Sequence, residues 1–172
     1  MELIDVMLKR RSTRKFNGQP VTMGELDRIL HAGLLAPTSR NRKPCNFIVV
    51  EKKETLKELS ESKDHGAKLI EGADKAIVVV GDAMIADTWI EDSSIALTYM
   101  HLMASELGLG SCWVQIHLRS KDGCDSEGIV RDILKIDSHY RIVGILALGH
   151  SDDIPKAHTL DDMDKSKIHF LV

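Results

Sequence analysis

The chain has 172 residues, about the length of one ordinary domain. Hydrophobic residues make up 43% of it and charged residues 28%, which are the proportions of a globular protein and argue against disorder, collagen and coiled coil. The net charge is −3 and the isoelectric point is about 6.2, so composition gives no general reason to expect nucleic acid or an anionic membrane as a partner.

The cysteines and the N-terminal sequence indicate a cellular compartment. Cys45, Cys112 and Cys124 cannot form a closed set of disulfides and show no C-x-x-C spacing, which favours a reducing environment. The first residues contain no apolar segment typical of a signal peptide, and no window approaches the ~18 apolar residues of a membrane span. We therefore expect a cytoplasmic protein with a single domain over residues 1–172.

Hydrophobic periodicity predicts the elements of the first half. A short helix is expected over 2–10, and a second over 23–36, which starts after the capping box Thr22-x-x-Glu25 and ends before Pro37. The β-branched run 46–50 predicts a strand, and the continuous apolar run 76–80 predicts a strand buried on both faces. Short helices are expected over 53–61 and about 64–72.

The longest predicted helix, about 84–108, carries apolar side chains on more than one side. Such a helix is buried on more than one side. It is either the central core helix of a monomer or part of a subunit interface. Gly108 and Gly110 are expected to end it as C-cap glycines.

The remaining sequence predicts strands over 111–116 and 140–148 and a helix over 126–134. A β-like hydrophobic tail, Ile168–Val172, follows a polar stretch. It either adds as an edge strand to a sheet, which could belong to another subunit, or is a frayed or self-docked terminus. Because strands and helices alternate without strict βαβ order, we expect an α+β fold with a mixed sheet packed by helices.

The stretch Lys9–Lys15 is the sharpest charge feature, with five cationic residues among seven in an acidic chain. It could be a solvated basic face, a nucleic-acid patch or a phosphate site. Ser12 and Thr13 lie between the cations, and hydroxyls beside guanidinium groups suit a compact phosphate better than a long polyanion. The scattered histidines show no metal-ligand spacing, so no metal site is expected.

A polar loop over residues 36–44 is bracketed by Pro37 and Pro44 and lies between a predicted helix and a buried strand. Loops held between rigid elements often carry functional sites. An ordinary surface turn is the alternative at this point.

Four sequence patterns in this order resemble the FMN-dependent nitroreductase family. The first is R-R-S-x-R-x-F, here residues 10–16, and the second is A-P-S-x-x-N-x-Q-P-W, here residues 36–45. The third is G-L-G-S-x-W at residues 108–113. The last is A-L-G-Y/H at residues 147–150, followed by K-x-R at residues 156–158, so the patterns span nearly the whole chain.

This resemblance implies a central mixed or antiparallel sheet flanked by helices, in an intertwined homodimer with FMN at the subunit interface. It implies ping-pong transfer of two electrons from NADH or NADPH through FMN to a nitroaromatic, a quinone or a similar small acceptor. The chemistry belongs to the flavin, so no catalytic residue of the protein is implied. The alternative is a flavin-binding module, serving as sensor, store or electron carrier, without efficient NAD(P)H oxidation.

The resemblance also assigns residues by position. Arg10 and Ser12 match phosphate and ribityl contacts, and Arg14 matches a cation near the pyrimidine edge of the flavin. The Thr38–Ser39 segment matches a contact from the partner subunit. The full set implied as cofactor-binding is Arg10, Arg11, Ser12, Arg14, Pro37, Thr38, Ser39, Asn41, Lys68, Trp113, Val114, Gln115, Lys156 and His158.

Three departures from the family patterns bear on the site. Lys43-Pro44-Cys45 stands where the family has Gln-Pro-Trp, which removes an aromatic side chain. His158 replaces the arginine of K-x-R and is a weaker, pH-dependent phosphate partner. Residues 117–125 form only a brief loop where longer members insert helices, so a more open pocket is expected.

Overall fold

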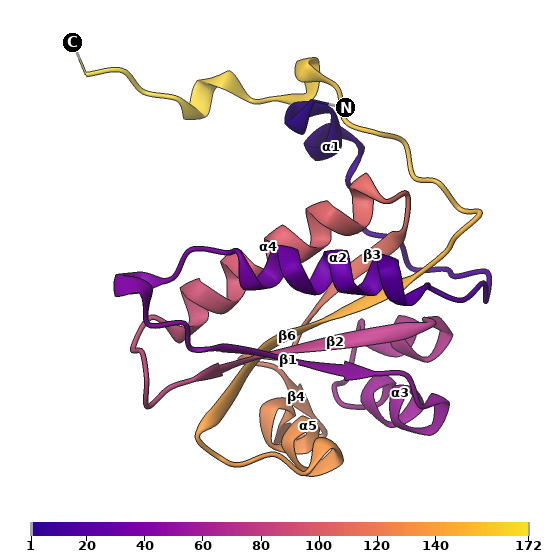
Figure 1. The fold of residues 1–172 in the computed structure, drawn as a ribbon, viewed down its shortest axis with the longest axis vertical. Helices are drawn as coiled ribbons and strands as arrows, with labels where there is room; N and C mark the ends of the chain where they lie inside the picture. The colour runs from indigo at the N-terminus through magenta and orange to yellow at the C-terminus, as the bar shows by residue number, and fades with distance from the viewer. Residues whose placement is uncertain (1, 172) are drawn as a thin grey trace.

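The computed structural model describes residues 2–171 and places a four-stranded sheet between two layers of helices (Figure 1). The sheet order is β1-β2-β6-β3, and every neighbouring pair is antiparallel. The strands are β1 (Cys45–Val50), β2 (Lys75–Asp82), β3 (Gly110–Gln115) and β6 (Tyr140–Gly149). The predicted α+β class is confirmed, and the sheet is antiparallel except for one parallel bridge between Ser12 and Ser111.

One helical layer consists of α2 (Met23–Leu34) and α4 (Trp89–Glu106), with α1 (Leu3–Lys9) beyond α4 (Figure 1). The predicted capping box forms, since Glu25 N donates to Thr22 Oγ1 at 3.3 Å and Thr22 N donates to Glu25 Oε2 at 2.8 Å. Gly33 lets α2 approach the sheet and α4, because a Cβ there would lie 2.9 Å from both Met100 Sδ and Phe47 Cζ.

The opposite layer consists of α3 (Lys53–Ser60), α5 (Ser126–Leu134) and the 3₁₀ helix η2 (Lys68–Gly72). Side chains alternate along β2, so Ile77 and Val79 face α2 and α4 while Val78 and Val80 face α3 and α5. The strand is therefore buried on both faces, as its continuous apolar sequence predicts.

Three predicted boundaries are wrong. The long helix begins at Trp89 rather than near residue 84, because Asp82 Oδ1 accepts a hydrogen bond from Met84 N at 2.9 Å and holds that segment in a turn. The expected helix over 64–72 is only the 3₁₀ turn η2, since Gly66 has a φ of +81°. Gly108, with a φ of +75°, follows the end of α4, whereas Gly110 is the first residue of β3 and not a cap.

A small hairpin, β4 (Ser120–Lys121) and β5 (Cys124–Asp125), lies between β3 and α5. Asp122 and Gly123 both have positive φ, at 49° and 80°, as a two-residue hairpin turn requires. The Asp-Gly pair is the sequence signal for this turn, which sequence analysis passed over.

The C-terminal segment leaves β6, passes the segment of residues 10–16 and runs away from the sheet (Figure 1). It contains the 3₁₀ turns η3 (Leu160–Asp162) and η4 (Lys165–Lys167), and every described residue from Lys156 to Leu171 is exposed. The expected β-like tail forms no strand within its described part, and Val172 lies outside the described residues. No helix in the described part of the chain is long and apolar enough to cross a bilayer.

Candidate functional site

The basic segment over residues 10–16 is extended and lies beside the free edge of β3. Thr13 N donates to Ser111 O at 2.9 Å, and Asn17 N donates to His150 O at 3.0 Å. Side chains of an extended segment alternate, so Arg10, Ser12 and Arg14 share one side and Arg11 and Thr13 the other. Two cations and a hydroxyl are thus presented together.

Side chains from the first side of this segment lie near the buried thiol of Cys112 on β3. Burial raises the pKa of Cys112, while Arg14, the Ser12 side chain, Lys63 and Arg10 lie close enough to oppose that rise. Lys63 is held there because its Nζ donates to Gln115 O at 2.9 Å. Lys63 lies in the loop before η2 and belongs to none of the sequence patterns, so it was not predicted as a site residue.

Burial, followed by the nearby Arg119, lowers the pKa of Lys63 from its ordinary value. Three cations therefore converge at β3, and Arg14 is exposed while Arg10 and Ser12 are half-buried. Such a set can hold a compact anion such as a phosphate group.

Arg10 is also tied to the central helix. Its Nη1 lies 3.1 Å from Nε2 of His101 on α4, and Nδ1 of His101 lies 2.6 Å from Ser111 Oγ. The His101 side chain is buried, with 6% exposure. Sequence analysis grouped His101 with the scattered histidines, and its only signal was its position on the long helix.

The second side of the basic segment meets the C-terminal segment. Arg11 Nη1 donates to Lys156 O, and His158 N donates to Leu8 O at 2.9 Å. A hollow of about 490 Å³ lies here, and its lining includes Arg11, Lys156, Ser105 and Gly108. The structure thus brings Lys156 next to the basic segment and His158 next to Leu8 of α1, although both side chains are exposed.

Trp113 and Gln115 at the end of β3 are held by a hydrogen bond between their side chains and by one to the neighbouring backbone. Trp113 Nε1 donates to Gln115 Oε1 at 2.9 Å, and Gln115 Nε2 donates to His117 O at 3.1 Å. The indole lies across Gly144 of β6, where a Cβ would come within 2.8 Å of Trp113 Nε1. Val114 is buried in the core, so only its backbone faces outward along the strand edge.

The loop with Pro37, Thr38, Ser39 and Asn41 lies elsewhere in the structure. Ser39 N donates to Asp92 Oδ1 at 2.9 Å, near the start of α4, and Lys43 N donates to Thr38 Oγ1 at 3.0 Å. Arg40, Asn41 and Lys43 have positive φ values of 50°, 55° and 52°, so these contacts hold a conformation that L-residues rarely adopt.

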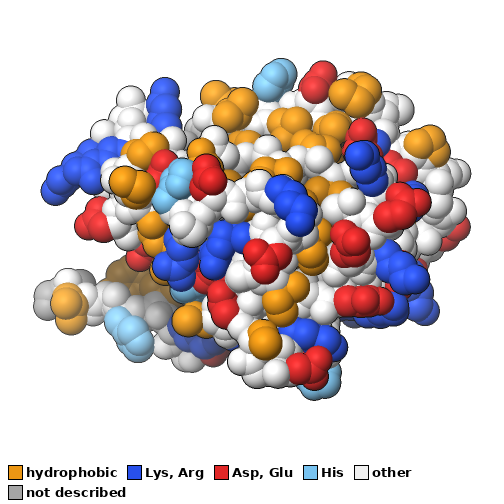
Figure 2. Space-filling model, turned by 90° about the horizontal axis from the view of Figure 1, so that it is seen from below, with side chains coloured by type: hydrophobic (Ala, Val, Ile, Leu, Met, Phe, Trp, Pro, Cys, Tyr) orange, Lys and Arg blue, Asp and Glu red, His pale blue; other side chains and the backbone are white. Residues whose placement is uncertain are grey.

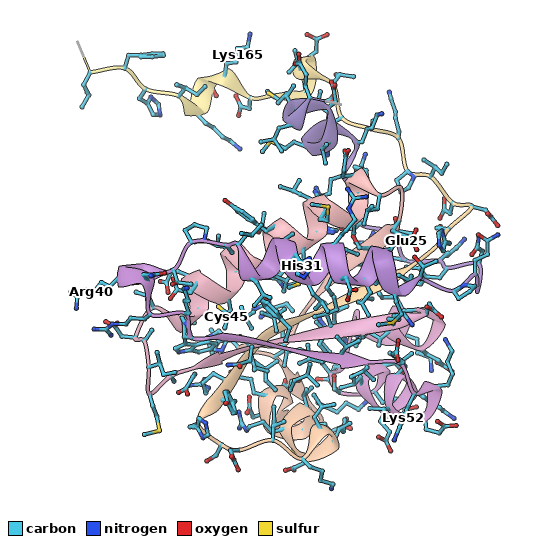
Figure 3. All side chains as sticks on the ribbon, in the orientation of Figure 1. Glu25, His31, Arg40, Cys45, Lys52 and Lys165 are labelled. Carbon is cyan, nitrogen blue, oxygen red and sulfur yellow. The ribbon has the colours of Figure 1, made fainter. Side chains whose placement is uncertain are left out.

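The loop and the basic segment are anchored at different places on α4. Asp92 and His101 are nine residues apart, which corresponds to about 14 Å along the helix axis and about half a turn around it. In Figure 1 the loop lies at the far left, and Figure 3 labels Arg40 there, whereas the segment that leads into α2 lies at the right. The fold of the described chain therefore does not bring the two groups together.

Lys68 also stands apart from the convergent cations. It lies on η2 with an exposed side chain, and its Nζ is 2.5 Å from Glu71 Oε2. The contact from Glu71 raises the pKa of Lys68 above its ordinary value.

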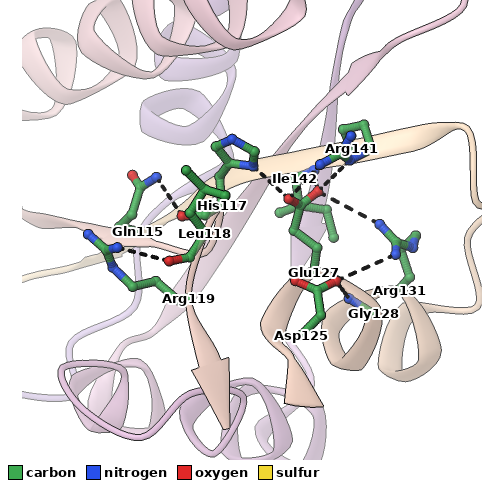
Figure 4. A network of polar contacts seen from close by, with 10 residues as sticks. All are labelled: Gln115, His117, Leu118, Arg119, Asp125, Glu127, Gly128, Arg131, Arg141 and Ile142. Carbon is green, nitrogen blue, oxygen red and sulfur yellow. Dashed lines mark hydrogen bonds and ion pairs between the residues drawn. The ribbon is translucent and has the colours of Figure 1, made fainter. Parts of the chain in front are cut away.

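A second polar cluster centres on the buried carboxylate of Glu127 at the start of α5 (Figure 4). Arg141 donates two hydrogen bonds to it, from Nε at 2.8 Å and Nη2 at 3.0 Å, and His117 Nδ1 lies 2.6 Å away. Burial alone would raise the pKa of Glu127, but the hydrogen bonds from Arg141, His117 and Ile142 N bring it to about 2. With these partners the cluster anchors α5 to the sheet.

Figure 2 views the molecule from the side of α3 and α5, where positive and negative side chains are interspersed. Among the described residues no group of His, Cys, Asp and Glu could hold a metal ion. The cations beside β3 are the strongest candidate for a ligand site because Arg10, Arg14 and Lys63 lie close together there.

Comparison with known proteins connects this site with one family. The nitroreductase family model matches residues 7–74 and 57–150. A structure described as an FMN-dependent nitroreductase from Clostridium difficile R20291 is 42% identical, with a TM-score of 0.95, over 97% of this chain and 98% of that one.

Two sequence relatives span most of the chain. A protein of Archaeoglobus fulgidus, provisionally named NADH dehydrogenase/NAD(P)H nitroreductase, is 30% identical over 98% of this chain and 97% of its own length. A protein of Methanothermobacter thermautotrophicus with the same provisional name is 31% identical over 96% of this chain and 85% of its own.

Proposed function

The chain belongs to the nitroreductase family, and on that premise we propose that it is an FMN-dependent oxidoreductase. Its substrates are NADH or NADPH as electron donor and a nitroaromatic, a quinone or a similar small molecule as acceptor. The observation that carries the proposal is that Arg10, Ser12, Arg14 and Lys63 all lie near Cys112 of β3. The FMN-dependent protein from Clostridium difficile, at 42% identity, supports the choice of cofactor.

The residues present fit FMN. A phosphate group carries a charge of roughly −1.5 to −2, which Arg10 and a second cation offset. The family pattern also assigns Lys156 to the phosphate, and the structure places Lys156 beside Arg11 in the neighbouring hollow, on the other side of the basic segment from Arg10. Gly110 lets the basic segment lie close to β3, since a Cβ there would come within 2.7 Å of Thr13 Cγ2.

FMN supplies the hydride chemistry when it is bound. The role of this chain is to bind and orient the ring system and to set its potential. Arg14 provides positive charge where reduction adds negative charge, which stabilises the reduced form. In the proposed ping-pong order, the nicotinamide leaves the pocket before the acceptor enters it.

We propose that the functional unit is a homodimer. The separation of the Thr38–Ser39 loop from the basic segment favours a site to which a second copy contributes the loop. The exposed tail supports this arrangement, since Ile168, Phe170 and Leu171 are 61%, 83% and 101% exposed in one protomer. Ile95 and Tyr99 of α4 are also exposed, at 37% and 42%, beside Trp113.

The purified protein provides the direct test of cofactor binding. We expect a yellow protein whose heat-released flavin is FMN, in equal molar amount with the chain. A colourless protein that takes up no FMN on incubation would contradict the proposal. Release of FAD in place of FMN would contradict the cofactor assignment alone.

A further inference from the structure

His101 connects three elements at one point of the candidate site. It comes from the middle of α4, its Nε2 lies 3.1 Å from Nη1 of Arg10, and its Nδ1 lies 2.6 Å from Oγ of Ser111 on β3. Ser111 is also the residue that pairs with the basic segment, through the bridge to Ser12. The imidazole therefore lies behind the cationic side of that segment.

The contacts determine which ring nitrogen of His101 carries the proton. An arginine has only donors, so Nε2 must accept from Arg10. The proton of a neutral ring then sits on Nδ1 and is donated to Ser111 Oγ. Burial, and then the charge of Arg10, lower the pKa of His101 to about 4, so the ring is neutral at physiological pH and keeps this acceptor.

A single hydrogen bond of this kind matters because arginine is long and flexible. A free Arg10 side chain would lose considerable rotamer freedom on binding an anion. A bond from Nη1 to a rigid, buried acceptor removes much of that freedom beforehand and leaves the other N–H donors of the guanidinium for the ligand.

We infer that His101 is a positioning residue that holds the Arg10 guanidinium in place for the phosphate group of the flavin. This inference rests on the proposed function, because the phosphate is that of FMN. It assigns no contact between His101 and the flavin, so His101 acts only through Arg10.

A matched pair of substitutions separates positioning from packing. In His101→Gln the amide reaches as far as Nε2 and can accept from Arg10, whereas in His101→Asn it reaches only as far as Nδ1. We expect His101→Asn to weaken FMN binding about tenfold and riboflavin binding, which lacks the phosphate, less than about twofold. His101→Gln should bind FMN within about threefold of the wild type.

The measurement uses protein saturated with FMN or riboflavin and diluted stepwise, with released flavin followed by its fluorescence. In an Arg10→Ala background, His101→Asn should cause no further loss of FMN affinity. Ser111→Ala serves as a second route should His101→Asn unfold, with an expected loss of about threefold for FMN and little for riboflavin.

Two results would overturn the positioning role while leaving the proposed function intact. These are an equal loss of FMN and riboflavin affinity in His101→Asn, or a full loss that persists in the Arg10→Ala background. Wild-type protein that binds neither flavin would instead overturn the proposed function, and the positioning role with it.

Discussion

Side chains point to alternate sides of the extended basic segment, and this alternation decides which of its cations lie together. Arg10, Ser12 and Arg14 share one side because the segment is anchored to β3 and β6 through Thr13 and Asn17. Arg11 faces the C-terminal segment instead and donates to Lys156 O. The run of cations is thus divided between two surfaces, and only one of them includes Lys63 and the Cys112 thiol.

Truncation of the cations on that side tests the assignment. Arg10→Ala and Arg14→Ala should each lower FMN affinity by about 10- to 100-fold, the range expected for loss of a charged hydrogen bond. Arg14→Ala should also shift the flavin potential downward, because the reduced form loses a favourable charge. Affinity is measured by flavin fluorescence and potential by reductive titration against a reference dye.

Lys15→Ala is the control for these variants, since Lys15 is cationic and exposed but lies on the alternate side. It should keep FMN affinity and potential near the wild-type values. Full flavin content and an unchanged potential in both arginine variants would show that the assignment is wrong.

The buried His101 makes stability depend on pH. Burial and Arg10 lower the pKa of His101 to about 4, below the ~6.5 of a histidine in an unfolded chain. Between these two pH values the unfolded protein therefore binds more protons than the folded protein does. The contribution of His101 to stability is present above pH 6.5 and is lost as the pH falls to about 4. Relative to His101→Gln, the wild type should lose on the order of 3 kcal/mol of unfolding free energy between pH 7 and pH 4.

Urea denaturation of both proteins at the two pH values measures this difference. Glu127, with its pKa near 2, loses its contribution at lower pH in both proteins and cancels in the comparison. An equal loss in wild type and variant would contradict the neutral, buried state of His101.

Sequence patterns identified part of this residue set and could not identify the rest. Arg10, Ser12 and Arg14 are local, and the rule of alternation places them together once the segment is known to be extended. Lys63 and His101 come from a loop and a helix 50 to 90 residues further along the chain. Only the tertiary packing of α4 and β3 brings them to the same place.

At the scale of elements, Gly110 sets how closely the basic segment approaches β3. The sequence presents it as a second helix-capping glycine, but its requirement is steric. A Cβ would come within 2.7 Å of Thr13 Cγ2 and 3.3 Å of Gly149 O. The hydrogen bond from Thr13 N to Ser111 O depends on this close packing.

Gly110→Ala should therefore destabilise the protein by about 1–3 kcal/mol, as overpacking does, and should weaken FMN binding by displacing the basic segment. Gly24→Ala is the matched control, since nothing lies within 4 Å of its added Cβ, and it should stabilise by about 0.4–1 kcal/mol. Thermal unfolding gives both values. A neutral Gly110→Ala would contradict the steric requirement.

Periodicity predicted most elements but misplaced their ends where side-chain contacts compete with helix formation. The capping box of Thr22 and Glu25 predicted the start of α2 because its hydrogen bonds join residues only three positions apart. The start of α4 was missed because Asp82 Oδ1 binds Met84 N and holds a turn where apolar spacing continues. The short β4–β5 hairpin lacks enough residues to produce a period.

Across the whole molecule, two apolar features of the described residues 2–171 are open to solvent. The exposed tail runs past α1, and an apolar groove of about 630 Å³ lies between α1, α2 and α4, lined by residues such as Met7, Leu35 and Leu102. From sequence alone, the helix over about 84–108 could be a core helix or part of a subunit interface, and the apolar tail could add to a sheet, which could belong to another subunit, or be a frayed or self-docked terminus. The proposed homodimer would place both at the subunit interface.

Removal of the tail tests the dimer. A chain that ends at Lys165 should dimerise more weakly than the full chain, because it lacks the exposed apolar residues Ile168, Phe170 and Leu171. Sedimentation velocity over a range of concentrations gives the monomer–dimer equilibrium of both proteins. A full-length protein that sediments as a monomer at every concentration would contradict the dimer.

The proposed function requires that this chain takes electrons from a nicotinamide onto bound FMN. The most direct measurement is the visible absorbance of the purified, flavin-loaded protein before and after NADH or NADPH is added without oxygen. We expect the flavin bands to bleach on this addition and to return when a quinone or nitroaromatic is added. Bands that persist with both nicotinamides would contradict the claim and indicate a flavin-binding module with another role.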